Sequence, residues 1–131
     1  MSKINWRSQL GWSEEQLDDL RYTGYAYIRQ GKYQIALTFF EALHLLNPTN
    51  AYDIQILGAL YLELKDYPKA LRYFDRALQI DKDHVPTLIN LSKALISIGK
   101  KEEALKLAYR LKNDPNTAVA NIAKALILAH A

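Results

Sequence analysis

A pattern of small and aromatic residues that returns every 34 positions constrains the fold of this chain more than any other feature. In residues 51–84 it marks the places where two antiparallel helices must touch: Gly58, Tyr61, Tyr67, Ala70, Phe74 and Ala77. In the preceding copy the pattern reads Gly24, Tyr27, Tyr33, Ala36, Phe40 and Leu43. In the following, weaker copy it reads Ser92, Leu95, Lys101, Ala104, Ala108 and Leu111. Because a period of this size is typical of stacked helical repeats, the sequence predicts an all-α solenoid.

Helix start and stop signals set the boundaries of the repeats. Ser13 and Gln16 are expected to form a capping box that opens the first helix, and Asn47-Pro48 ends the second. The sequence predicts helices over residues 13–29, 33–46, 49–64, 67–80, 84–98, 101–113 and 117–131. A chain of 131 residues is expected to form one domain, 1–131. Within it we place repeats at 17–50, 51–84 and 85–116, followed by a capping helix at 117–131.

The N-terminal segment, residues 1–12, is too apolar for a plain tail, because it carries Ile4, Trp6, Leu10 and Trp12. Two interpretations stay open at this point. The segment forms a short helix that packs on the domain, or it packs on a second copy of the chain.

The C-terminal helix has a single charged side chain, Lys124. We expect a buried stripe made of Val119, Ile122, Ala123 and Leu126. Ile127 and Leu128 then widen the apolar arc. Either the helix is tucked deeply into the array, or it exposes a second interface for a partner or for a homodimer. The residues of that possible interface are Ile122, Leu126, Ile127 and Leu128.

Composition and motifs argue against several classes of function. There are no cysteines, so thiolate zinc sites and cysteine nucleophiles are excluded. His44, His84 and His130 have no metal-ligand companions at useful spacing, and no phosphate loop or nucleophile elbow is present. A net charge of +3 does not favour nucleic acid as a partner, and neither a signal peptide nor a membrane span is visible. We expect a cytoplasmic protein that is not an enzyme and has no cofactor and no metal.

The repeat resembles the tetratricopeptide repeat, a helix–turn–helix unit of 34 residues. The resemblance covers residues 17–116, numbered from Leu17, Ala51 and Val85. The family's small residue at position 8 matches Gly24, Gly58 and Ser92. Its alanine at position 20 matches Ala36, Ala70 and Ala104, and its aromatic at position 24 matches Phe40 and Phe74. Because Ala108 replaces that aromatic in the third repeat, we expect the third repeat to pack least tightly.

The resemblance also implies a binding groove, because the first helix of each repeat lines the concave surface of such arrays. The groove positions of the family correspond here to Arg21, Tyr22, Tyr25, Ile28, Arg29, Tyr52, Gln55, Ile56, Ala59, Leu62, Ile89, Asn90, Lys93 and Ile96. One subgroup of the family grips C-terminal carboxylates, but Tyr25 and Ala59 stand where it needs polar groups. The groove is instead apolar and aromatic with sparse cations, which suits an extended peptide.

Residues 27–81 are similar to the type III secretion chaperones of the tetratricopeptide class, especially the translocator chaperones. The similarity is carried by Gly31-Lys32-Tyr33, Phe40-Glu41-Ala42-Leu43 and Leu57-Gly58-Ala59. It implies a chaperone that keeps an apolar segment of a secreted translocator soluble before export. The C-terminal helix looks closer to chaperones of needle subunits or other export components.

Two other functions remain open from the sequence. The first is a general scaffold or co-chaperone adaptor that binds through an outer basic face. Residues 93–112 support it, because they hold six basic side chains against two acidic ones and form either a solvated face or a surface for an acidic partner. The second is a protein that assembles with itself through its terminal helices.

Overall fold

The computed structural model describes residues 4–131, so the first three residues of the predicted N-terminal segment lie outside the described part. Its helices are α1 (Trp6–Leu10), α2 (Glu14–Arg29), α3 (Tyr33–Leu46), α4 (Ala51–Glu63), α5 (Tyr67–Ile80), α6 (Val85–Ser97), α7 (Lys101–Leu111) and α8 (Thr117–His130). There is no strand among residues 4–131, and the ends of α2 to α8 fall within two residues of the predicted ends. The predicted all-α solenoid is confirmed.

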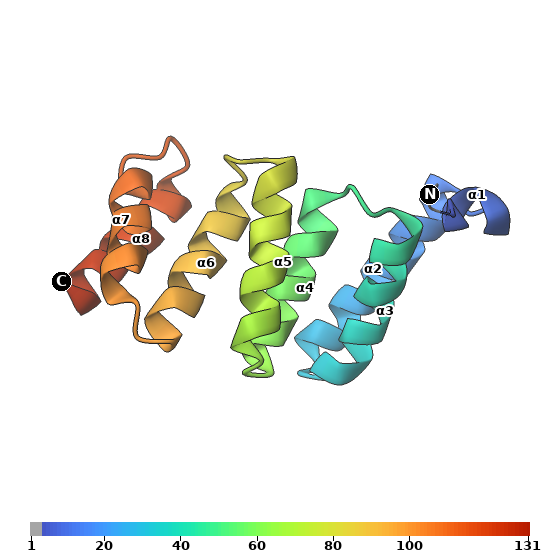
Figure 1. The fold of residues 1–131 in the computed structure, drawn as a ribbon, viewed down its shortest axis with the longest axis horizontal. Helices are drawn as coiled ribbons and strands as arrows, with labels where there is room; N and C mark the ends of the chain where they lie inside the picture. Colours follow the sequence, from blue (N-terminus) through green and yellow to red (C-terminus); the bar gives the residue numbers. More distant parts are fainter. Residues whose placement is uncertain (1–3) are drawn as a thin grey trace.

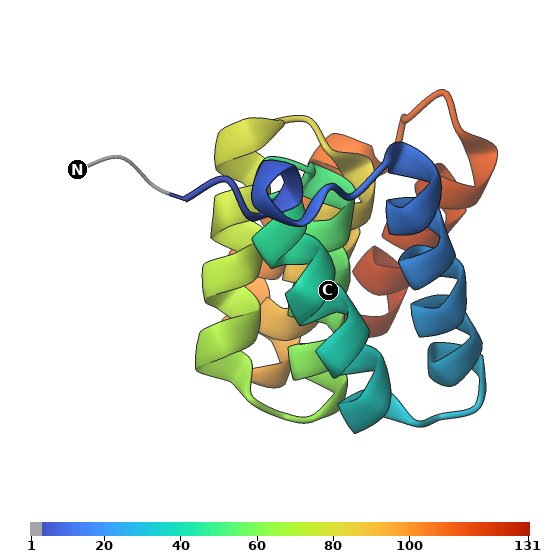
Figure 2. The same ribbon diagram turned by 90° about the vertical axis from the view of Figure 1, so that its right-hand side faces the viewer.

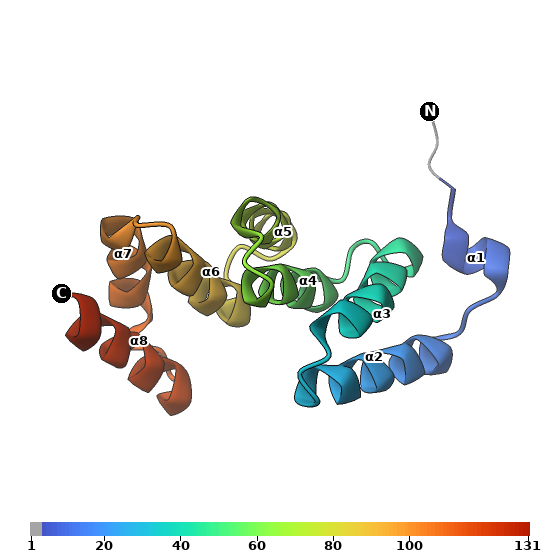
Figure 3. The same ribbon diagram turned by 90° about the horizontal axis from the view of Figure 1, so that it is seen from below.

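The helices form antiparallel pairs that stack in chain order, α2 with α3, α4 with α5 and α6 with α7. Figure 1 shows them side by side in one row, with α8 after the last pair. Seen from below in Figure 3, the row is a shallow arch. The first helices of the pairs and α8 form its inner side, and α3, α5 and α7 form its outer side. A peptide bound on the inner side of the arch would therefore contact different helices from a peptide bound on the outer side.

Glycine lets the two helices of a pair approach closely in the first two repeats. A Cβ atom built on Gly24 would lie 2.6 Å from Phe40 Cε2, and one built on Gly58 would lie 2.5 Å from Phe74 Cε1. Both phenylalanines are fully buried. In the third repeat Ala108 replaces the ring and Ser92 replaces the glycine, and both of these residues are buried. The buried ring thus fits only because the residue that faces it is glycine.

The N-terminal helix α1 packs on the domain rather than standing free. Asn5 caps it, and Gly11 ends it with a φ of 68°. Arg7 ties the helix down through an ion pair of 2.7 Å with Glu14 and a 3.1 Å hydrogen bond from its Nε to the Trp12 carbonyl. Figure 2 shows α1 lying across the end of the array, where it contacts α3. One of the two interpretations of this segment is therefore observed.

The C-terminal helix α8 packs on α7 and α6. Ala120 and Ala123 are its buried residues. Val119, Leu126 and Ile127 pack against the core cluster that contains Leu88, Ile89, Ala108 and Leu111. The predicted buried stripe is wrong at Ile122, which is 42% exposed, because Ile127 takes its place in the core.

The capping box at the start of α2 is confirmed. The Ser13 backbone N–H donates to Gln16 Oε1 at 2.9 Å, and the Gln16 backbone N–H donates to Ser13 Oγ at 3.2 Å. Trp12, which precedes the capping residue, packs against the core cluster that holds Leu17, as in a hydrophobic staple.

Candidate functional site

A cavity of about 200 Å³ opens on the inner side of the arch, between the first helices of the three pairs. Its lining consists of Ile28, Tyr33, Ile56, Ala59, Leu60, Leu62, Glu63, Asn90 and Lys93. Six of these nine were predicted as groove residues from the repeat numbering: Ile28, Ile56, Ala59, Leu62, Asn90 and Lys93. The structure thus brings together predicted residues from α2, α4 and α6.

The inner surface follows a simple rule of spacing. Residues at repeat positions 6, 9 and 12 lie one helical turn apart and so share one face of each first helix. On α2 they are Tyr22, Tyr25 and Ile28; on α4 they are Ile56, Ala59 and Leu62; on α6 they are Asn90, Lys93 and Ile96. When α8 is counted from its own first residue, Thr117, the same positions are held by Ile122, Ala125 and Leu128. The stripe is apolar or aromatic on three helices and polar at two of its three positions on α6.

The exposed part of α8 therefore belongs to this stripe. Ile122 is 42% exposed and Leu128 is 85% exposed, whereas Leu126 and Ile127 pack into the core. The four residues of the predicted second interface do not form one surface. Two of them extend the inner stripe, and the other two hold the helix in place.

An aromatic cluster occupies the end of the groove nearest the start of α4. Tyr25 packs edge to face on Phe40, with ring centroids 5.5 Å apart. Tyr52 packs edge to face on His84 at 6.0 Å and is 46% exposed. Burial, together with the neighbouring hydroxyl of Tyr52, raises the pKa of Tyr25 above its ordinary value. Tyr25 thus packs against the core, while nearly half of the surface of Tyr52 is exposed to solvent.

Arg21 was predicted as a groove cation, but its charge is already paired. Its Nε and Nη2 each donate to a different carboxylate oxygen of Asp53 at 2.8 Å. Its Nη1 donates to Asp18 at 2.7 Å. Asp53 is fully buried, and the Asp53 hydrogen bond is the main reason why the pKa of Arg21 is raised further. This bidentate pair joins α2 to α4 and fixes the angle between two walls of the groove.

The remaining predicted groove residues differ in how far their side chains are exposed to solvent. Gln55 and Ile89 are buried, 3% and 8% exposed, and they face neighbouring helices rather than the open groove. Tyr22 is 73% exposed, and Arg29 is exposed beyond the end of the cavity. Ile96 is half-buried and lies one turn beyond Lys93.

Sequence reasoning missed three lining residues: Tyr33, Leu60 and Glu63. Tyr33 is the first residue of α3, and Glu63 is the last residue of α4. Both lie at turns between the paired helices, which the groove positions of the repeat do not include. Tyr33 could have been found from its position directly after the Gly31-Lys32 turn, because this turn lies at the edge of the groove.

Residues 4–131 contain no group of three or more histidine, cysteine, aspartate or glutamate side chains that could hold a metal ion. None of the described helices is long and apolar enough to cross a membrane.

The repeat region of the chain matches a known protein family and several curated proteins. The family model described as "Anaphase-promoting complex, cyclosome, subunit 3" matches residues 29–111. Anaphase-promoting complex subunit 3 of Schizosaccharomyces pombe is 32% identical over 89 residues, which cover 68% of this chain and 13% of that protein. The chain spans less than a fifth of the length of the curated relatives that it matches.

Solved structures match the chain from end to end. The type III secretion translocator chaperone SycD of Yersinia enterocolitica superposes with a TM-score of 0.87 at 18% identity, covering 98% of this chain and 99% of that one. PcrH of Pseudomonas aeruginosa, in complex with the chaperone binding region of PopB, superposes with a TM-score of 0.80 at 24% identity, covering 88% and 98%. At these identities the likeness establishes a shared fold.

Proposed function

The chain belongs to the tetratricopeptide-type family described as anaphase-promoting complex, cyclosome, subunit 3, and we propose that it is a non-catalytic chaperone of a type III secretion client. In this proposal the protein holds an apolar segment of the client on the inner side of the arch. It keeps that segment soluble in the cytoplasm before export. The observation that carries the proposal is the apolar stripe on α2, α4 and α8, which no described element covers.

The extent of the structural likeness supports this choice within a broad repeat family. The match to the family model ends at residue 111, before α8 begins. The match to SycD covers 98% of the chain and 99% of SycD, so the two arrays correspond in length. PcrH has the same fold and is seen with the chaperone binding region of PopB.

The groove favours a client with apolar side chains. The cavity of about 200 Å³ exceeds the ~150 Å³ that accepts a benzene-sized group, so it admits one large apolar side chain. The Asn90 amide, at the edge of the cavity, can hydrogen-bond the peptide backbone of the client. Lys93 and Glu63 bring one charge of each sign to the rim. The client segment is therefore expected to be extended and mostly apolar, with polar residues outside the cavity.

The test compares two isoleucines of the same array. Ile56→Ala removes apolar contact from the cavity, so we expect client affinity to fall roughly tenfold, measured by calorimetry with a co-expressed translocator or needle protein. Ile80→Ala is the matched control, because Ile80 is 41% exposed at the end of α5 and does not line the cavity. We expect it to leave affinity unchanged.

Two results would contradict the groove as the client site. One is unchanged affinity in Ile56→Ala, Tyr25→Ala and Tyr52→Ala. The other is an affinity that falls steeply with salt while these variants bind normally, which would favour the adaptor function through an outer basic face.

A further inference from the structure

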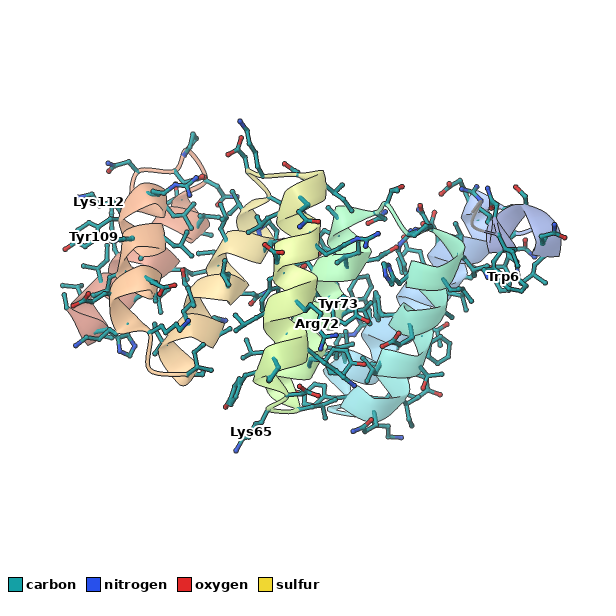
Figure 4. The ribbon with its side chains drawn as sticks, viewed as in Figure 1. Trp6, Lys65, Arg72, Tyr73, Tyr109 and Lys112 are labelled. Carbon is teal, nitrogen blue, oxygen red and sulfur yellow. The ribbon has the colours of Figure 1, made fainter. Side chains whose placement is uncertain are left out.

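A second and larger cleft, of about 450 Å³, lies on the outer side of the arch between α3 and α5. It is lined by Glu41, His44, Tyr61, Lys69, Arg72, Tyr73 and Arg76. Figure 4 labels Arg72 and Tyr73 where α5 faces α3. None of these residues belongs to the inner stripe, so the two surfaces are separate.

The cleft holds three positive charges against one negative charge. Lys69, Arg72 and Arg76 face one carboxylate, Glu41, and that carboxylate accepts the Tyr61 hydroxyl hydrogen bond at 2.7 Å. Within residues 4–131 none of the three cations makes an ion pair. Positions 69, 72 and 76 share one face of α5, where like charges repel one another. An arrangement that disfavours the free protein in this way is suited to an anionic ligand.

The floor of the cleft is rigid and aromatic. The rings of Tyr61 and Tyr73 stack with centroids 5.5 Å apart and an interplanar angle of 2°. His44 packs edge to face on Tyr73 at 5.9 Å, and Lys69 Nζ lies 5.2 Å above the Tyr61 ring. His44 Nδ1 is buried and has no hydrogen-bond partner among the described residues. Lys69 thus lies above an aromatic surface that also contains a polar atom without a hydrogen-bond partner.

We propose that this cleft binds an extended acidic segment of a protein partner, with two carboxylates placed two residues apart. Arg72 and Arg76 are four residues apart on a helix, which separates them by about 6 Å along its axis. In an extended chain, side chains at i and i+2 point to the same side about 6.6 Å apart. Each guanidinium can therefore take one carboxylate in the bidentate geometry that arginine favours.

The inference goes beyond the proposed function and does not rest on it. A client held on the inner side leaves α3 and α5 uncovered on the outer side. The protein could then bind its client and an acidic partner at the same time. Loss of one binding event should leave the other intact.

The test uses two synthetic peptides of identical composition at low ionic strength, Gly-Glu-Ser-Glu-Gly and Gly-Glu-Glu-Ser-Gly. The first has its carboxylates on one side when extended, and we expect it to bind several-fold more tightly than the second. Arg72→Gln and Arg76→Gln should each weaken its binding roughly tenfold. Arg110→Gln is the matched control, because Arg110 is an exposed arginine on α7 outside the cleft, and it should leave binding unchanged.

The imidazole signals of His44 in NMR spectra locate the bound peptide. In the free protein, burial and then the charge of Arg76 lower the pKa of His44, while Glu41 and Asp53 act weakly in the opposite direction. A carboxylate bound beside Arg76 offsets part of its charge, so the pKa of His44 should rise on binding. The expected result is this rise with the first peptide in the wild-type protein and its loss in Arg76→Gln.

Three results would overturn the proposal. Equal binding of the two peptides would contradict the carboxylate spacing, and equal weakening in Arg110→Gln would indicate general charge attraction. A shift of the His44 signals with inorganic phosphate that equals the shift with the first peptide would show that the cleft takes any small anion.

Discussion

Replacing Arg21 with methionine is expected to lower the free energy of unfolding by about 3–5 kcal/mol. The variant leaves the Asp53 carboxylate fully buried without the two hydrogen bonds that Arg21 donates to it. A buried charge that loses its partner has neither water nor protein to stabilise it. Urea unfolding followed by far-UV circular dichroism at pH 7 measures the loss. Acidification should recover part of it, because protonation removes the uncompensated charge.

Three further variants sharpen this expectation. Asp53→Leu should be less harmful than Arg21→Met, because Arg21 keeps Asp18 and its side chain is 15% exposed. The double variant Arg21→Met/Asp53→Leu should lie within about 1 kcal/mol of the wild type, since both charges are gone. Arg7→Met is the control for an exposed ion pair and should change stability by about 1 kcal/mol or less. An Arg21→Met protein as stable as Arg7→Met would contradict the structural role of the pair.

The fold could be predicted from local signals, because each repeat packs only on its neighbours in the sequence. The period of small and aromatic residues therefore indicates the tertiary contacts as well as the helices. The capping box at Ser13 and the proline at Pro48 act within one helical turn, so they set helix ends to within two residues. The face of α8 was harder to predict. Ile122 and Ile127 are both isoleucines on an apolar helix, and only the position of α6 and α7 decides which one packs against the core.

Six of the nine residues expected in the groove at repeat positions 6, 9 and 12 line the cavity, and none of those at position 5 does. Ile56, Ala59 and Leu62 share one face of α4 and line the cavity. Position 5 corresponds to Arg21, Gln55 and Ile89, and each of them points toward an adjacent helix. The partner of Arg21 lies 32 residues away, a distance at which no local pattern connects the two charges. The outer cleft has the same origin, since its cations and its carboxylate come from different repeats.

Replacing Gly58 with valine is expected to lower the free energy of unfolding by roughly 3 kcal/mol. Its Cβ would lie 2.5 Å from the buried ring of Phe74, so α4 and α5 must move apart. Overpacking a core typically costs 1–3 kcal/mol, and a β-branched residue regains little of the helix propensity that alanine would restore. Thermal unfolding measures the loss. Because α4 carries the middle of the groove, client affinity should also fall in this variant.

A double-variant cycle separates this clash from a general effect of position 58. Gly58→Ser in the wild-type background should be destabilising by about 1–3 kcal/mol. In a Phe74→Ala background, itself about 3–5 kcal/mol less stable, the same serine should have almost no further effect. The pair then copies Ser92 and Ala108, which coexist in the third repeat with both residues buried. A serine that is equally harmful in both backgrounds would show that a neighbour other than the ring of Phe74 requires glycine at this position.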